Sequence, residues 1–170
     1  LVNGLIEFLV GRLSVDYLPK DPVTIGAAVG MPLALLGLVA LVTYLKRWRW
    51  LWDNWLTSLD AKKIGVMYII VAIVMMLRGV ADAGMMRLQT AVAANGASGP
   101  LNTDTFQQVF TAHGTIMIFF VAMGLAFGLI NCVMPLLIGA RDMAFPMLNS
   151  ISFWLFVAGM VLVNAALVFG

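Results

Sequence analysis

Four long runs of apolar residues divide the chain and predict four membrane-spanning helices. They cover residues 23–45, 64–89, 106–137 and 143–170, and each exceeds the roughly 20 residues that a helix needs to cross a bilayer. The sequence therefore predicts an all-α fold, a polytopic membrane helical bundle, with residues 1–170 forming part of one domain.

The composition supports a membrane protein. Of the residues, 62% are hydrophobic and only 11% are charged, which excludes an ordinary soluble domain and a disordered one. Cys132 is the one cysteine, so an internal disulfide framework is excluded. The net charge of +2 comes from residues in the loops, so we expect no nucleic acid as a partner.

The loop charges predict the orientation of the chain. Basic residues lie between the first two helices and, as Arg141, between the last two, whereas residues 90–105 contain no Lys or Arg. The positive-inside rule then places the first and third loops in the cytoplasm and the N-terminus outside. The basic residues of the first loop are accompanied by tryptophans typical of a membrane interface: Trp48, Trp50, Trp52 and Trp55.

The third apolar run contains the only histidine of the chain, His113. An imidazole inside a membrane helix normally has a partner such as a metal, a carboxylate or a backbone carbonyl. His113 and Asn131 are eighteen residues apart, close to five turns at about 100° per residue, so we expect both on one face. With Gly114 leaving room beside it, His113 is a candidate axial ligand of a haem iron, and the alternative is a histidine bonded to a neighbouring helix.

The second run contains three charged residues near its outer end. Arg78 and Asp82 are four residues apart and can pair on one helix face, while Arg87 points to the opposite face. We interpret the pair as a polar pocket, with Arg87 facing an anionic group inside the bundle. The alternative is that the arginines extend along the helix to the lipid headgroups.

A third polar group surrounds the last loop. Asp142 is predicted to face the cytoplasm, and Asn131 and Asn149 lie just inside the membrane on the flanking helices. A carboxylate followed by amides that can order water is typical of the mouth of a proton pathway. The alternative is an ordinary loop aspartate beside Arg141.

Taken together, these residues resemble subunit I of the haem-copper terminal oxidases, in particular the cytochrome bo-type ubiquinol oxidases. The matching stretches occur in the family's order: 55–60 (WLTSLD), 69–75 (IIVAIVM), 78–83 (RGVADA), 110–114 (FTAHG) and 138–149 (IGARDMAFPMLN). An additional first helix is also a feature of the bo-type branch. The resemblance implies a part of a larger subunit of twelve or more helices.

The resemblance implies roles for the residues near the haem and the quinol. His113 corresponds to an axial ligand of a low-spin haem b, and Arg87 to the arginine at the periphery of that haem. Arg78, Asp82 and Gln108 correspond to quinol-site residues, with Thr105 beside them where the family usually has a histidine. Threonine can hydrogen-bond a quinone oxygen but cannot take its proton at neutral pH.

The resemblance also implies the reaction and its setting. Asp142 corresponds to the mouth of a proton pathway, with Asn131 and Asn149 above it. The complete subunit would carry a high-spin haem (o or a type) and copper, oxidise ubiquinol, reduce O₂ to water and pump protons. Its partners would be the rest of subunit I and subunits II, III and IV, in the bacterial inner membrane with a periplasmic N-terminus.

Two further expectations concern the chain as given. It lacks an initiator Met and ends at Gly170 without a polar tail, so we expect an N-terminal fragment that is inactive by itself. With one histidine it cannot build an oxygen-reducing site, so no catalytic residue is expected within it. The alternatives are a cytochrome c oxidase subunit I, which Thr105 leaves open, and a non-enzymatic membrane helical subunit with His113 simply buried.

Overall fold

A computed structural model describes residues 33, 36, 37, 39–96, 99 and 101–169. Every regular element within these residues is a helix, as the all-α prediction expects. The predicted first span, 23–45, falls largely outside the described residues, of which 39–44 are helical. The other three predicted spans all form helices.

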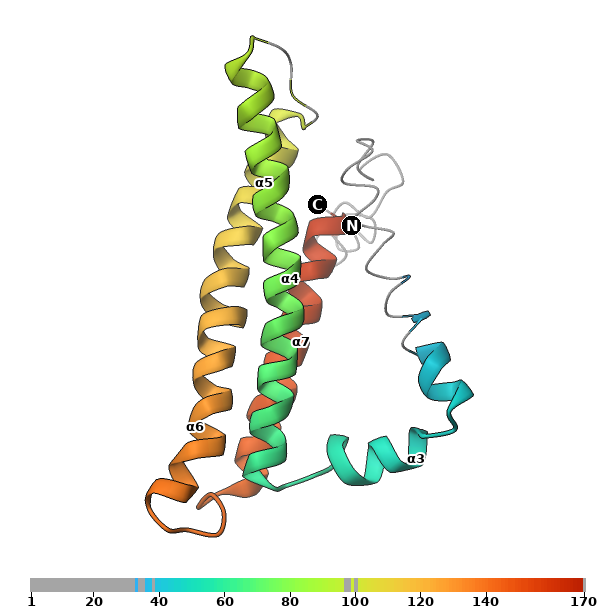
Figure 1. Ribbon diagram of the computed structural model, residues 1–170, viewed down its shortest axis with the longest axis vertical. Coiled ribbons are helices and arrows are strands. Elements are labelled where there is room, and N and C mark those ends of the chain that lie inside the picture. The colour runs from blue at the N-terminus through green and yellow to red at the C-terminus, as the bar shows by residue number, and fades with distance from the viewer. Residues whose placement is uncertain (1–32, 34–35, 38, 97–98, 100, 170) are drawn as a thin grey trace, which may run out of the picture.

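Three long helices run up, down and up beside one another (Figure 1). They are α4 (Ala61–Ala94), the continuous helix formed by α5 (Thr103–Thr115), η3 (Ile116–Ala122) and α6 (Met123–Leu137), and α7 (Pro146–Phe169). Each of the three is long and apolar enough to cross a membrane. We call the two ends of this bundle the Ala61 end and the Ala94 end, after the first and last residues of α4.

Helix α4 is longer than the apolar run that predicted it. Its 34 residues span about 51 Å, well beyond a hydrocarbon core of about 30 Å. It begins at Ala61 because two carboxylates accept hydrogen bonds from its first N–H groups: Asp60 from Lys62 at 2.9 Å and Asp142 from Ala61 at 3.2 Å. It ends at the turn containing Gly96, where φ is +75°.

The buried face of α4 follows a spacing of four and three residues and forms one continuous stripe. Its members are Ala61, Gly65, Tyr68, Ala72, Met75, Gly79 and Asp82. Apolar clusters centred on Tyr68, Met75 and Met85 lie along this stripe, so α4 is the central helix of the core. Asp82 is the charged member of this buried stripe and lies at the spacing that its apolar members follow.

The contact between α4 and α6 is close because glycines face each other. A Cβ atom at Gly128 would lie 2.6 Å from Ile69 Cγ1 and 2.9 Å from the Gly65 carbonyl oxygen. Gly124, four residues earlier on α6, would meet Ala72 at 3.1 Å. This small-xxx-small spacing lets the two backbones approach, as is usual for helices in membranes.

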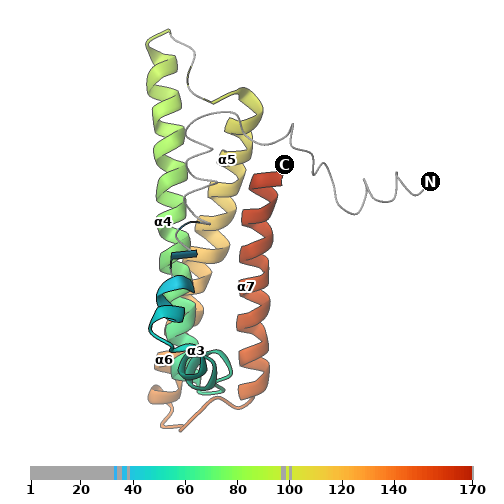
Figure 2. The same cartoon turned by 90° about the vertical axis from the view of Figure 1, so that its right-hand side faces the viewer.

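The segment between the first predicted span and α4 forms two short helices, α3 (Trp48–Leu51) and η2 (Trp52–Leu56). They lie at the level of the Ala61 end of the bundle, to one side of it (Figures 1 and 2). Trp55 packs against the core cluster that contains Ile64 and Tyr68. The tryptophan-rich segment is therefore attached to the bundle at one end.

Candidate functional site

Arg78 and Asp82 form an ion pair on the buried face of α4. Their exposed fractions are 7% and 0%. Apart from this ion pair, neither the guanidinium Nη atoms nor the carboxylate oxygens have a hydrogen-bond partner. Buried polar atoms are almost always hydrogen-bonded, so these atoms are candidates to bind a polar group outside the described residues.

The burial of Arg78 bears on the two interpretations of this residue. A side chain that extends to the headgroups would be exposed, whereas the side chain of Arg78 is buried among its neighbours. Arg87, on the other face of α4, is exposed. The structure therefore separates the two arginines as their nine-residue spacing predicts.

His113 contacts α4 directly beside this pair. Its Nδ1 atom lies 3.0 Å from the carbonyl oxygen of Gly79, the residue that follows Arg78. A carbonyl oxygen only accepts, so Nδ1 carries the hydrogen and Nε2 keeps a free lone pair. The ring is half-buried, and the space beside Gly114 is open, with no atom within 4 Å of a Cβ built there.

Two other predicted quinol-site residues lie on α5 but are not bonded to the pair. Gln108 is exposed and Thr105 is half-buried in the first turn of the helix. The backbone N–H of Thr105 donates to Asn102, which caps α5, at 2.7 Å. The structure thus places Thr105 and Gln108 on the helix that also carries His113, toward the Ala94 end.

A second polar cluster occupies the Ala61 end of the bundle. Asn149 Nδ2 on α7 donates to Asn131 Oδ1 on α6 at 2.6 Å, and Asn131 Nδ2 donates to the Phe127 carbonyl at 2.9 Å. Asn131 is 4% exposed. The two asparagines that the sequence places on separate helices therefore form one amide pair, in which Asn131 is buried and Asn149 is half-buried.

This amide pair continues into two residues that the sequence analysis missed. Ser152 Oγ donates to the Asn149 carbonyl at 2.8 Å and lies 3.0 Å from the hydroxyl of Tyr68 on α4. Ser152 follows Asn149 by three residues, a spacing that puts both on one face of α7. The result is a line of polar groups from α6 through α7 to α4, in which the Asn149 backbone carbonyl links the amide pair to Ser152.

Asp142 lies at the same end but outside this line. Its Oδ1 accepts from the N–H groups of Ala61 and Met143, and the side chain is exposed. No described hydrogen bond joins it to Asn131 or Asn149. Asp142 therefore holds the last loop against the N-terminus of α4, beside the start of the polar line.

Asn164 on α7 is a further polar residue that the sequence analysis missed. Its Nδ2 donates to the Met160 carbonyl at 2.8 Å and lies 3.6 Å from Met75 Sδ, while its Oδ1 is buried without a partner. A polar asparagine within the apolar run 143–170 is the sequence feature that could have identified it.

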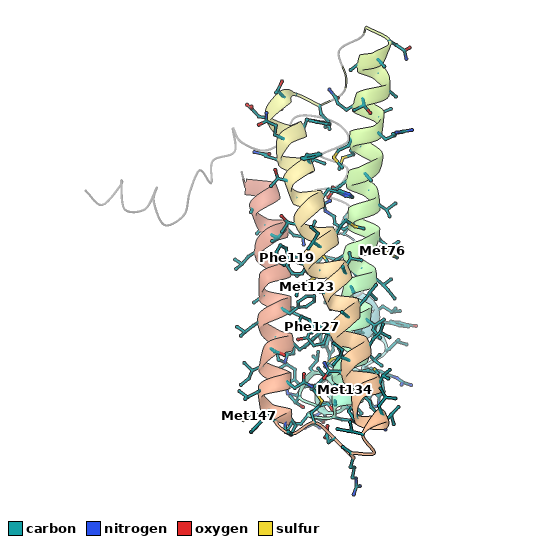
Figure 3. The ribbon with its side chains drawn as sticks, turned by 90° about the vertical axis from the view of Figure 1, so that its left-hand side faces the viewer. Met76, Phe119, Met123, Phe127, Met134 and Met147 are labelled. Atoms are coloured by element: carbon teal, nitrogen blue, oxygen red, sulfur yellow. The ribbon has the colours of Figure 1, made fainter. Side chains whose placement is uncertain are left out.

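An apolar groove of about 400 Å³ runs between α7 and the helix formed by α5, η3 and α6. Figure 3 shows Phe119, Met123 and Phe127 along it. Thr115 is its only polar lining residue, and neither Arg78 nor Asp82 lines it. The groove is therefore suited to hydrocarbon and is separate from the buried ion pair.

Comparison with known protein families matches residues 63–170 to "Cytochrome C and Quinol oxidase polypeptide I". The chain belongs to this family. The resemblance to subunit I of the haem-copper terminal oxidases is thereby confirmed.

Several proteins with sequences similar to this chain are named as quinol oxidases. It is 47% identical to the ubiquinol oxidase subunit 1 of Acetobacter aceti over 95% of its length, and 47% identical to the quinol oxidase subunit 1 of Bacillus subtilis over 91%. It is 46% identical to the cytochrome bo(3) ubiquinol oxidase subunit 1 of Buchnera aphidicola subsp. Schizaphis graminum over 95%. The chain spans about a quarter of the length of these relatives.

The described residues of this chain fit one of the family's cofactors, a haem. Haem and copper are the cofactors of haem-copper oxidases. The described residues contain no group of three or more His, Cys, Asp or Glu side chains that could hold a metal ion, so they form no copper site. His113 fits a single axial haem ligand, because a bond from Nδ1 to a carbonyl is the usual second contact of a metal-bound histidine.

Proposed function

We propose that the chain is part of the subunit I of a ubiquinol oxidase that reduces O₂ to water and pumps protons. The observation that carries this proposal is the buried Arg78–Asp82 pair, whose polar atoms form no hydrogen bond with other described residues. A cytochrome c oxidase receives electrons from a protein at its surface and needs no buried polar pair for a small donor. A hydroquinone has two ring oxygens that can satisfy both side chains.

In this proposal the pair binds and orients the quinol. Asp82 accepts a hydrogen bond from one ring hydroxyl, and Arg78 donates to a ring oxygen. The carboxylate can also accept one of the two protons that leave when the quinol is oxidised to the quinone. Thr105 and Gln108, on the helix that contacts α4, complete the quinol site from the Ala94 end.

His113 is proposed as an axial ligand of a low-spin haem b, with Arg87 at the haem periphery. When bound, the haem supplies a one-electron acceptor next to the quinol site. The Gly79 carbonyl holds the imidazole so that Nε2 is directed away from α4 and free to ligate. The rest of the subunit would supply the second axial ligand, a high-spin haem of o or a type, and copper.

Asp142, Asn131 and Asn149 are proposed to begin a proton pathway. Asp142 is exposed at the Ala61 end, and the amide pair lies inside the bundle. Ser152 and Tyr68 extend this line to α4, because Ser152 bonds the Asn149 backbone carbonyl and lies within hydrogen-bond distance of the Tyr68 hydroxyl. Hydroxyl and amide groups of this kind can order the water that carries protons.

The bacterial relatives and the apolar helices support a placement in the bacterial inner membrane, and the charge distribution supports an orientation there. Arg141, Lys62 and Lys63 lie at the Ala61 end, whereas residues 90–105 contain no Lys or Arg. This end would face the cytoplasm, and the N-terminus would be periplasmic. The exposed apolar surface would contact lipid, the rest of subunit I and subunits II, III and IV.

The experiment replaces Asp82 in the complete oxidase that contains this chain. Asp82→Asn should lower ubiquinol turnover by about a hundredfold, as expected for loss of a general base, with the optical spectra of both haems unchanged. Asp104→Asn, an exposed carboxylate in the first turn of α5, is the matched control and should keep full turnover. Full turnover by Asp82→Asn, or loss of haem from it, would contradict the proposed role.

A further inference from the structure

The helix that precedes α3 ends in a sharp turn at Lys46. This residue has a φ of 51°, in the left-handed region where glycine is usual. Its N–H donates to the Thr43 carbonyl at 3.0 Å, and the N–H of Arg47 donates to the Val42 carbonyl at 3.2 Å. This is the pattern of a Schellman turn. It places Lys46, Arg47 and Arg49 at one exposed corner of the molecule.

Tryptophans alternate with these cations. Trp48 and Trp50 are 44% and 49% exposed, although indole rings are mostly buried in proteins. Arg47 Cζ lies 5.7 Å from the centre of the Trp50 ring, and Trp48 Nε1 donates to Thr43 Oγ1 at 2.9 Å. The side chains at this corner therefore have defined positions while remaining open to an external partner.

The cations of the corner have no acidic partner in the described part of the chain. The one ion pair among the described residues joins Arg78 to Asp82 on α4. Asp53, the carboxylate nearest to the corner along the chain, forms no ion pair. Among the described residues, the segment 46–63 and the loop between α6 and α7 have more cations than carboxylates. The cations are Lys46, Arg47, Arg49, Lys62, Lys63 and Arg141, and the carboxylates are Asp53, Asp60 and Asp142.

The corner also lies where lipid headgroups would be. The apolar helices α4 and α7 both begin at the Ala61 end, and α6 ends there (Figures 1 and 2). Trp55 holds the segment against the core cluster at this end. Exposed indoles beside cations are typical of the boundary between hydrocarbon and headgroups.

We propose that the basic-tryptophan corner, Lys46 to Trp50, binds the headgroup of an anionic phospholipid. Guanidinium groups match the phosphate oxygens, the indoles lie along the glycerol and upper acyl region, and the turn at Lys46 fixes the cations relative to the rings. The orientation proposed above assigns this lipid to the cytoplasmic leaflet. The lipid site does not depend on that orientation, because it requires only the residues from Lys46 to Trp50 and a membrane.

The test uses the complete oxidase, exchanged into detergent with equal amounts of phosphatidylglycerol and phosphatidylcholine and then examined by native mass spectrometry. The unmodified protein should retain phosphatidylglycerol preferentially. Each cation near an anionic membrane surface contributes about a fivefold factor in binding, so Lys46→Gln/Arg47→Gln/Arg49→Gln should lower this retention by up to about a hundredfold. Lys62→Gln/Lys63→Gln/Arg141→Gln removes the same charge at the same end and should retain the lipid.

Equal loss in both variants would mean that net charge alone attracts the lipid, and would overturn the site. Undiminished retention in the first variant, or loss of another oxidase subunit in place of lipid, would also overturn it. A salt titration of the unmodified protein tests the proposal without variants that could misfold. Phosphatidylglycerol retention should fall with ionic strength while phosphatidylcholine retention stays constant, and a retention independent of salt would contradict the proposal.

Discussion

His113 and Gly79 are joined by a hydrogen bond of 3.0 Å from the imidazole Nδ1 to the backbone carbonyl oxygen. Because Gly79 follows Arg78, the proposed haem ligand is bonded to the peptide next to the proposed quinol site. Both sites therefore depend on the same turn of α4. A change in the backbone at Gly79 should be detected in the properties of the haem as well as in quinol oxidation.

Gly79→Ala tests this link. The added Cβ would lie 2.7 Å from Met117 Sδ, so this side chain must move against η3, and we expect the nearby bond from His113 to the Gly79 carbonyl to weaken. Loss of a bond worth about 0.5–1.5 kcal/mol makes the imidazole a weaker donor to iron, which should raise the midpoint potential of the low-spin haem by about 20–60 mV. Gly84→Ala, where no atom lies within 4 Å, is the control. A redox titration that gives the same potential for Gly79→Ala and the unmodified protein would exclude the link.

His113→Ala should abolish the absorption spectrum of the low-spin haem in the complete oxidase, because no other histidine is present in this chain to replace the ligand. Thr111→Ala, at an exposed position two residues earlier on α5, should leave the spectrum intact. Difference spectra of membranes provide the measurement. A low-spin spectrum that survives in His113→Ala would show that this residue is only a buried histidine bonded to α4.

Asp142→Asn should slow proton uptake while retaining the fold. An asparagine keeps the Oδ1 atom that accepts from Ala61 and Met143, so we expect stability to change by less than about 1 kcal/mol. Turnover and proton pumping in vesicles, measured together with thermal unfolding, separate the two effects. Asp60→Asn, the other carboxylate at this helix end, should keep normal pumping. Normal pumping by Asp142→Asn would remove it from the pathway.

Gly128→Ala should destabilise the bundle by about 1–3 kcal/mol. Its Cβ would meet the Gly65 carbonyl at 2.9 Å and Ile69 Cγ1 at 2.6 Å, and the backbone of α4 cannot move aside cheaply. Gly84→Ala again serves as the control and should be neutral or stabilising, since alanine favours a helix by up to about 1 kcal/mol. Thermal unfolding in detergent compares the two. Equal melting temperatures would show that the α4–α6 contact tolerates a methyl group.

The long helices could be predicted from the sequence because each contains an uninterrupted apolar run. Their ends could not be predicted from hydropathy. The predicted end of α4 at residue 89 was wrong because the helix continues through the alanine-rich residues 91–94 to the glycine turn at Gly96. The π-helical turn η3, between His113 and Asn131, was also not predicted, because apolar residues fill a π-helix as well as an α-helix.

The site was predictable where it depends on spacing within one helix. The Arg78–Asp82 pair follows from a separation of four residues, and the position of Arg87 on the other face of α4 from a separation of nine, whereas its exposure among the described residues differs from the interpretation that it faces into the bundle. Contacts between helices, such as Asn149 with Asn131, depend on how helices pack and need the structure. For the same reason neither the Gly79 carbonyl nor Tyr68 could be identified in advance as the partner of His113 or Ser152.

The most direct test of the central claim is a measurement of electron-donor specificity. The complete oxidase that contains this chain is purified and given ubiquinol or reduced cytochrome c, with oxygen consumption recorded for each. The buried Arg78–Asp82 pair predicts rapid oxygen consumption with ubiquinol and none with reduced cytochrome c. Oxygen consumption driven by reduced cytochrome c, with none from ubiquinol, would contradict the account.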